Sequence, residues 1–203
     1  MTEPITTPAE APAPKRRRAD AERSVVAILD AALEALASDP DSSMSEIARR
    51  AGVVRATIYV HFPTRTALLD AVMEHAVAQV VESMRGAEPQ RGEPVEALER
   101  VLRATWRQLA QFHGLLAMNT ARLSAEELHR RHVPMLDQIE PLIERGQKKG
   151  VFRSDLPVAW HLAVVRAIVH AASAAIQGGR IAESEAEAAM LTTAINAIAT
   201  PHV

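Results

Sequence analysis

The stretch SMSEIARRAGVVRATIYVHF, residues 43–62, contains two short segments with helical spacing of apolar residues, separated by one glycine. Ser43 and Glu46 form the pattern S-x-x-E, a capping box that marks the start of a helix. Gly52 follows that helix and can adopt the left-handed backbone conformation that a tight turn needs. A second helix is expected at about residues 54–62, because Pro63 disfavours helical backbone in the residue before it. Two helices of about two turns joined in this way form a helix-turn-helix.

The polar side chains of the second short helix suit contact with DNA. In a helix-turn-helix, the second helix enters the major groove and its early residues meet base edges. Arg55 can bond a guanine edge or a phosphate, while Thr57 and Tyr59 can donate hydrogen bonds to either. His61 has the same capacity, and Arg65 stands in the first turn of the next helix, where free N–H groups also attract anions.

A purely structural interpretation of the same residues stays open on periodicity alone. The apolar residues of the stretch are expected in a core, and Tyr59 could simply pack against them. The residues expected to be buried are Ile47, Ala48, Val53, Ile58 and Phe62. On this alternative the chain is a generic helical bundle.

A basic run precedes the first predicted helix, which covers residues 19–38. The run consists of Lys15, Arg16, Arg17 and Arg18, and the preceding fourteen residues contain four prolines. We therefore predict that residues 1–18 form a disordered arm, which would add phosphate or minor-groove contacts. A solvated terminal charge cluster is the alternative.

Beyond residue 64 the sequence continues with helical periodicity and no convincing strand. The predicted fold class is all-α with about nine helices, divided into a helix-turn-helix domain at 19–64 and a second helical domain at 65–203. Further helices are expected at residues 64–85, 94–111, 113–122, 124–149, 157–177 and 184–199. Ser124 and Ser184 are the expected caps of two of them. Pro134 and Pro141 should kink or split the helix that contains them.

Composition excludes several classes of protein and site. The 203 residues include no Cys, so there is no disulfide framework and no thiol chemistry. No secretory signal is recognisable, and a cytoplasmic protein is expected. The most apolar stretch, residues 158–176, contains His161, Arg166 and His170, which favours a buried helix over a membrane span. The motifs of common hydrolases, metalloproteases and nucleotide-binding enzymes are absent, so we predict no enzyme activity.

The run SMSEIARRAGVVRATIYVHFPTRTALLDAV, residues 43–72, resembles the signature of the TetR family of bacterial regulators. Its hallmarks are Ile47-Ala48, Ala51-Gly52-Val53, Thr57-Ile58-Tyr59, His61-Phe62 and Leu68-Leu69. The resemblance is strong over residues 19–80. Beyond them it rests on the count and length of helices and on a local similarity at residues 150–157.

The resemblance implies roles for individual residues. Tyr59 and His61 match positions that usually bind phosphates, and Arg65 takes the place of a phosphate-binding Lys. The base-reading positions are Arg55, Ala56, Thr57 and Val60. Ser43 and the basic run 15–18 complete the expected DNA-contacting set.

One position departs from the family pattern. The recognition helix often opens with Ser or Thr in this family, whereas this chain has Val54. Loss of a side-chain cap typically costs ~1 kcal/mol. Since Ala56 is small and Val60 is apolar, direct base readout rests mainly on Arg55 and Thr57, and the operator sequence stays undetermined.

The resemblance also implies a homodimer that binds a palindromic operator, with double-stranded DNA as the partner and no membrane. The last two helices would form the dimer interface through small and branched residues; packing inside the monomer is the alternative for them. These residues are Ala167, Ile168, Ala171, Ala172, Ala174, Ala175, Ile176, Ala188, Leu191, Ile195 and Ile198.

The resemblance further implies a helical regulatory and dimerisation domain at 65–203, in which a small hydrophobic effector binds between the middle helices and releases the repressor from DNA. The candidate effector-contacting residues are Trp106, Phe112, His113, Met118, Asn119, Arg122, Met135, Arg166 and His170. Each of them could equally be an ordinary core or surface residue. A helical dimer that keeps the fold and interacts with protein alone is the competing function.

No cofactor is expected, and no metal site is predicted. His129 and His132 are spaced i, i+3 and could hold a metal with Glu126 or His113. Arg130 and Arg131 lie between them, which favours a solvated face.

Overall fold

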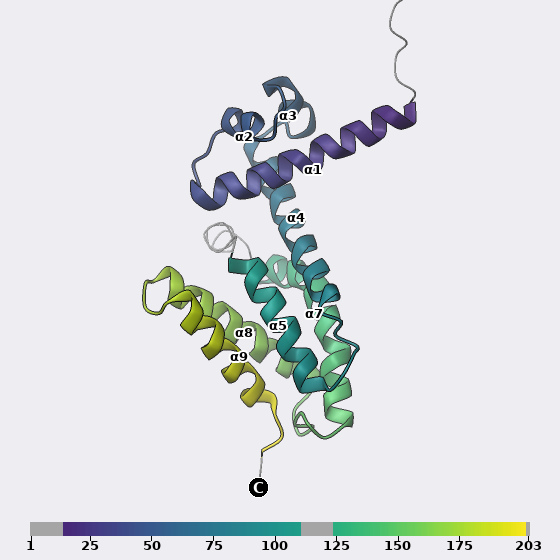
Figure 1. Cartoon of the computed structure of the whole chain (residues 1–203), viewed down its shortest axis with the longest axis vertical. Coiled ribbons are helices and arrows are strands. Elements are labelled where there is room, and N and C mark those ends of the chain that lie inside the picture. The colour runs from purple at the N-terminus through teal and green to yellow at the C-terminus, as the bar shows by residue number, and fades with distance from the viewer. Residues whose placement is uncertain (1–13, 111–123, 202–203) are drawn as a thin grey trace, which may run out of the picture.

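The structure is a computed structural model that describes residues 14–110 and 124–201. In this part of the chain it has eight helices and no strand; a single antiparallel bridge joins Phe152 to Ala199 (Figure 1). The helices are α1 (Pro14–Ser38), α2 (Met44–Arg50), α3 (Arg55–His61), α4 (Arg65–Gly86), α5 (Pro94–Ala110), α7 (Ala125–Lys148), α8 (Val158–Gln177) and α9 (Glu183–Ile198). The all-α prediction is confirmed. The ninth predicted helix, at 113–122, lies outside the described residues.

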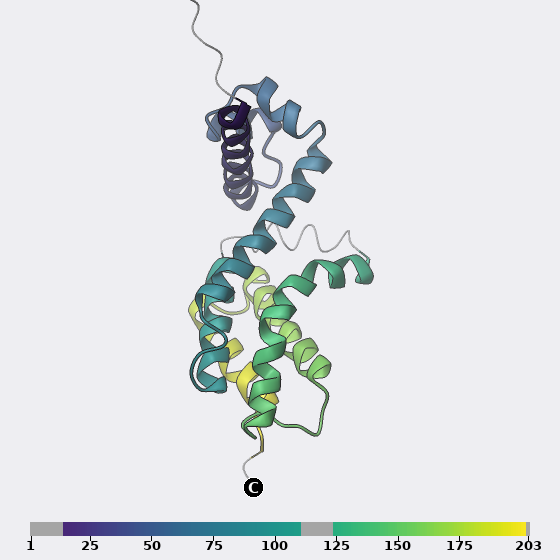
Figure 2. The same ribbon diagram turned by 90° about the vertical axis from the view of Figure 1, so that its right-hand side faces the viewer.

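The helices form two bodies that share α4. One body packs α1, α2 and α3 around the N-terminal part of α4, and the second packs the other end of α4 with α5, α7, α8 and α9 (Figures 1 and 2). Leu68 and Val72 of α4 are fully buried in the first core, while Val80 and Met84 are buried in the second. One continuous helix therefore connects the two cores.

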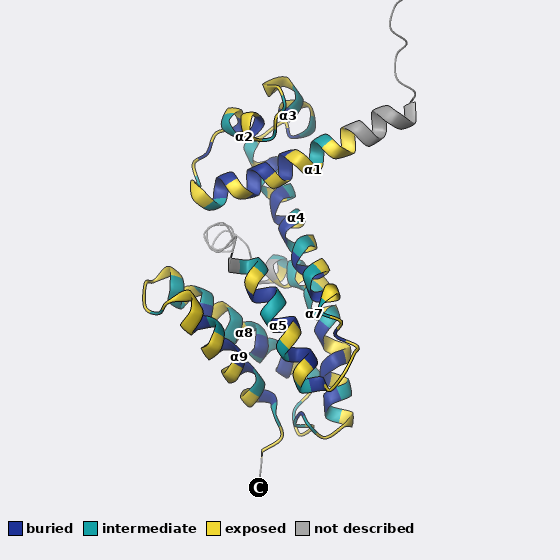
Figure 3. Cartoon of the chain, in the orientation of Figure 1, coloured by how far each residue is buried: buried dark blue, intermediate teal, exposed yellow. Residues whose placement is uncertain are grey.

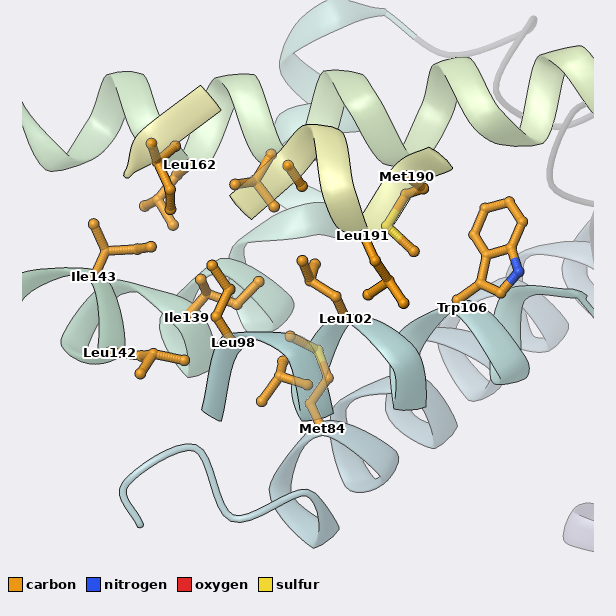
Figure 4. Close-up of a cluster of buried hydrophobic side chains, with 14 of the residues drawn as sticks. Met84, Leu98, Leu102, Trp106, Ile139, Leu142, Ile143, Leu162, Met190 and Leu191 are labelled. Carbon is orange, nitrogen blue, oxygen red and sulfur yellow. The ribbon is translucent and has the colours of Figure 1, made fainter. Parts of the chain in front are cut away.

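The larger core is mainly aliphatic and includes two aromatic side chains, Phe152 and Trp106, and Trp106 of α5 lies at one end of the view in Figure 4. Leu98 and Leu102 of α5 are buried in it together with Leu142 and Ile143 of α7, and α9 contributes Met190 and Leu191. Figure 3 shows that buried residues follow the inward faces of these helices and exposed residues the outward faces. Burial of this amphipathic surface, more than local propensity, stabilises the bundle.

Several helix boundaries differ from the sequence prediction. α1 begins at Pro14, earlier than the expected residue 19, so Lys15–Arg18 lie in its first turns and not in a preceding arm. Proline is well suited to a first helical turn, because its fixed φ is helical and its missing N–H would have no partner there. At α9 the N-cap is Ala182 and not Ser184, because the Glu185 carboxylate accepts the Ala182 backbone N–H at 3.0 Å.

α7 continues through both of its internal prolines as one helix. It bends along its length, as Figure 2 shows, so the prolines kink the helix without splitting it. The cause is local: a proline inside a helix removes one backbone hydrogen bond and its ring displaces the preceding turn.

Candidate nucleic-acid interface

The first helix of the helix-turn-helix starts with half of the predicted capping box. Ser43 Oγ accepts the Glu46 backbone N–H at 3.2 Å, which confirms the cap. The Glu46 carboxylate, however, accepts hydrogen bonds from Arg49 at 2.9 and 2.6 Å and from Arg50 at 3.0 Å. These arginines lower the pKa of Glu46 from 4.5 to about 2. The acid therefore stays ionised and offsets part of the positive charge of α2.

The turn into α3 uses a glycine where a left-handed backbone is required. Gly52 has φ +68°, and the Val53 N–H bonds the Ala48 carbonyl at 3.0 Å. The N-cap of α3 is Val54, with no side-chain cap bond, as its sequence implies. Ile58 is fully buried and Phe62 is 7% exposed, and both pack into the core of the first body. Burial of these two side chains fixes which face of α3 points outward.

The outward face of α3 carries the side chains predicted to meet DNA. Arg55 and Ala56 are exposed, Tyr59 is 39% exposed and Val60 is 75% exposed. Thr57 and His61 are partly exposed. The guanidinium carbon of Arg55 lies 5.5 Å from the Tyr59 ring centroid, within the range of a cation–π contact. The two residues therefore support each other on α3, which lies at one end of the molecule (Figure 1).

Arg65 has partners that sequence reasoning did not find. Its guanidinium donates to the Ser42 carbonyl at 2.5 Å and to the Pro40 carbonyl at 2.7 Å, while Thr64 caps α4 by accepting the Ala67 N–H at 3.1 Å. Arg65 therefore holds the α1–α2 connection against α4. These bonds use two of its five N–H donors, so three remain, and the prediction that Arg65 contacts phosphate stays a prediction.

Comparison with known proteins matches both halves of the chain to models of one protein family. The family model for bacterial regulatory proteins of the tetR family matches residues 28–72, and the model for the tetracyclin repressor-like C-terminal domain matches residues 94–198. The chain belongs to the TetR family.

Named relatives of this TetR-family chain are transcriptional regulators. The regulator NfxB of Pseudomonas aeruginosa is 27% identical over 159 residues, covering 77% of this chain and 84% of NfxB. The repressor LfrR of Mycolicibacterium smegmatis is 40% identical over 81 residues, which cover 40% of this chain and 43% of LfrR.

Solved structures agree over nearly the whole length. The LfrR structure in complex with proflavine, from Mycobacterium smegmatis, has a TM-score of 0.65 at 25% identity and covers 89% of this chain and 99% of that one. A TetR regulatory protein from Mycobacterium vanbaalenii has a TM-score of 0.63 at 28% identity and covers 91% and 99%.

The predicted effector-contacting residues lie in different places in the structure. Trp106 is 1% exposed within the larger core, and Met135 packs partly buried against the same core. Arg166 is partly exposed and His170 is exposed on α8. Five others lie outside the described residues: Phe112, His113, Met118, Asn119 and Arg122. A cavity of about 30 Å³ beside Arg145 and Pro141 is too small for an effector.

A chain of polar side chains joins the two bodies. His75 Nε2 on α4 lies 2.7 Å from Asp30 Oδ1 on α1, and Gln79 Nε2 lies 3.1 Å from the same oxygen. Gln108 of α5 donates to Gln79 Oε1 at 3.1 Å. Polar side chains therefore connect α5 to α4 and α4 to α1, and no local sequence pattern signals this contact.

A second link between the bodies lies on α7. Arg131 bonds Asp70 of α4 at 3.3 Å and Glu127 of its own helix at 3.0 Å. It is an ion pair between helices far apart in sequence, so it also required the tertiary structure to be found.

α8 is long and apolar enough, by length and composition alone, to cross a membrane. It packs between α7 and α9, and it carries buried His161, whose Nε2 lies 2.8 Å from the Arg153 carbonyl oxygen. We interpret α8 as a helix of the bundle.

Proposed function

We propose that this TetR-family chain is a repressor that binds a palindromic operator as a homodimer in the cytoplasm. The observation that supports it best is the outward face of α3. Ile58 and Phe62 anchor the helix while Arg55 and Tyr59 stand exposed on the side away from the core. A helix presented in this way can enter a major groove. Ala56, Val60 and Thr57 would then lie near base edges, and His61 near the backbone.

The uncapped start of α3 suits an anionic partner as well. Val54 supplies no side-chain acceptor, so the first N–H groups of the helix are left to solvent or to a ligand. A phosphate of the DNA strand would satisfy them. Ser43, the N-cap of α2, is exposed, and it remains in the proposed contact set together with residues 15–18.

The proposed dimer surface is an exposed stripe of small residues on α8. Ala167, Ala171 and Ala174 recur at helical spacing on one exposed face, in line with Trp160, which is 55% exposed. Small residues let two helices approach closely, and an exposed Trp is a typical interface residue. Ala188 of α9 is also exposed.

Other residues expected in the dimer interface are used inside the monomer. Ala172, Leu191 and Ile198 are buried in the larger core, so for them the alternative interpretation holds. The remaining candidates, Ile168, Ala175, Ile176 and Ile195, are partly exposed.

Release by a small hydrophobic effector completes the proposal. LfrR, the relative crystallised with proflavine, supports an effector of this kind by similarity. An effector that favours one arrangement of α5 and α7 would bias α4 through the contacts of Gln79 and Arg131, and so change the spacing of the two recognition helices.

The test is selection of bound sequences from a random duplex pool, followed by binding measurements over a range of salt concentrations. A dimeric reader yields two half-sites about one helical turn apart, and its affinity falls as salt rises. Tyr59→Ala should weaken binding to all duplexes alike, whereas Arg55→Ala should also relax preference at one base pair, at a cost of about 1–3 kcal/mol.

The competing function is a helical dimer that keeps the fold without controlled DNA binding. It predicts no enrichment in the selection and no salt-dependent duplex affinity. Variants of Tyr59 and Arg55 would then leave every measured interaction unchanged, which would overturn the repressor proposal.

A further inference from the structure

Two histidines from different helices of the bundle meet at the contact between α7 and α8. His132 Nε2 lies 3.2 Å from His170 Nε2, and the ring centroids are 5.3 Å apart with 60° between the ring planes. The residues are 38 positions apart in sequence. The sequence-based pair, His129 and His132, is thus not the pair that the fold brings together.

The separation of the two nitrogens matches that of two imidazoles on one metal ion. Zn²⁺ binds histidine nitrogen at about 2.0–2.1 Å with near-tetrahedral angles, which places two such nitrogens about 3.3 Å apart. A hydrogen bond between one neutral ring N–H and the other ring nitrogen has a similar length. The same arrangement therefore serves as a resting hydrogen bond that an incoming ion can replace with little movement of either ring.

The surroundings leave one of the two rings accessible, because His170 is exposed on α8. Arg166 lies one turn away on the same helix, and its positive charge acts at His170. That charge would repel a bound dication.

We propose that His132 and His170 form a two-histidine site for a divalent transition-metal ion of the zinc class. Water would complete the coordination of an ion that these two histidines hold. A site with two protein ligands exchanges its ion, in contrast to a structural zinc centre with four.

A bound ion would connect α7 to α8. Because the two ligands come from different helices, binding stabilises the packing of the regulatory bundle in the arrangement seen here. The metal would thus act on the same helices that the proposed effector is expected to rearrange. The inference itself rests on the side-chain geometry, and it stands or falls independently of DNA binding.

The experiment titrates Zn²⁺, and Ni²⁺ in parallel, into the untagged, chelator-treated full-length protein, followed by calorimetry and by the thermal midpoint. Saturable binding of one ion per chain is expected, with a midpoint that rises by a few degrees at saturation. His132→Gln and His170→Gln should each weaken binding by at least about tenfold. His129→Gln removes an exposed histidine one turn away on α7 and should bind as the parent does.

Arg166→Gln provides a control that should change the metal affinity in the opposite direction, upward. Removing its charge should tighten metal binding by about threefold or more, and no general loss of structure can produce a gain. The proposal is wrong if the ion does not bind saturably below millimolar concentration. It is also wrong if His129→Gln lowers the metal affinity as much as His132→Gln and His170→Gln do, or if the latter two variants keep the metal affinity of the parent. Circular dichroism of each variant confirms folding, so that a loss of binding is not a loss of fold.

Discussion

Replacing Arg65 distinguishes a structural role for this residue from a DNA-clamping one. Its guanidinium forms two hydrogen bonds, to the Ser42 carbonyl at 2.5 Å and the Pro40 carbonyl at 2.7 Å. Hydrogen bonds to a charged group contribute about 1.5–3 kcal/mol each. The side chain is partly exposed, so water can replace part of these two hydrogen bonds. We therefore expect Arg65→Ala to lower the free energy of unfolding by about 2 kcal/mol in total.

That loss corresponds to a thermal midpoint lower by roughly 4–8 °C for a chain of this size. The thermal midpoint of Arg65→Lys should lie between those of the parent and Arg65→Ala, because an ammonium group cannot reach both carbonyls with the geometry of a planar guanidinium. The assay is denaturant or thermal unfolding at one fixed protein concentration, since a dimer's stability depends on concentration.

Duplex binding of the same variants, measured over a salt series, tests whether Arg65 has a structural or a phosphate-clamping role. If Arg65 mainly supports the α1–α2 connection, the slope of log affinity against log salt stays close to that of the parent. If it mainly clamps a phosphate, the slope falls in magnitude by about 0.9 while unfolding is unchanged. The second pattern would refute the structural interpretation of its two carbonyl contacts.

Two further predictions concern stability and charge. Gly146→Ala should destabilise the protein, because the new Cβ would overlap the buried Phe152 ring, and overpacking costs about 1–3 kcal/mol. This cost opposes the gain of about 1 kcal/mol in helix propensity that Ala has over Gly. In an unfolding assay, adding Phe152→Leu to Gly146→Ala should recover part of the lost stability. Glu46→Gln should remove a stabilising contribution that is present above pH 4.5 and lost as pH falls toward 2, because the Glu46 pKa is lowered on folding; acid unfolding curves measure this. The same change frees Arg49 and Arg50, so duplex affinity should rise and become more sensitive to salt. An unchanged midpoint for the first variant, or an unchanged acid limb for the second, would contradict the reasoning.

The sequence by itself determined the elements whose cause is local. Ser43, Thr64 and Ser124 cap helices as expected, each accepting a backbone N–H three residues on. Gly52 has positive φ where the sequence predicts a turn, and Gly150 has positive φ directly after the helix predicted at 124–149. Caps, turns and apolar periodicity act within a few residues, so they can be recognised without the fold.

The tertiary structure alone decided which side chains meet. Arg65 bonds carbonyls 23 and 25 residues away, and His132 meets His170 at a separation of 38. It also selected which alanines of α8 are buried and which stay exposed. Such pairings depend on how helices pack, and packing is set by the shape of the whole core, for which no short segment carries the information.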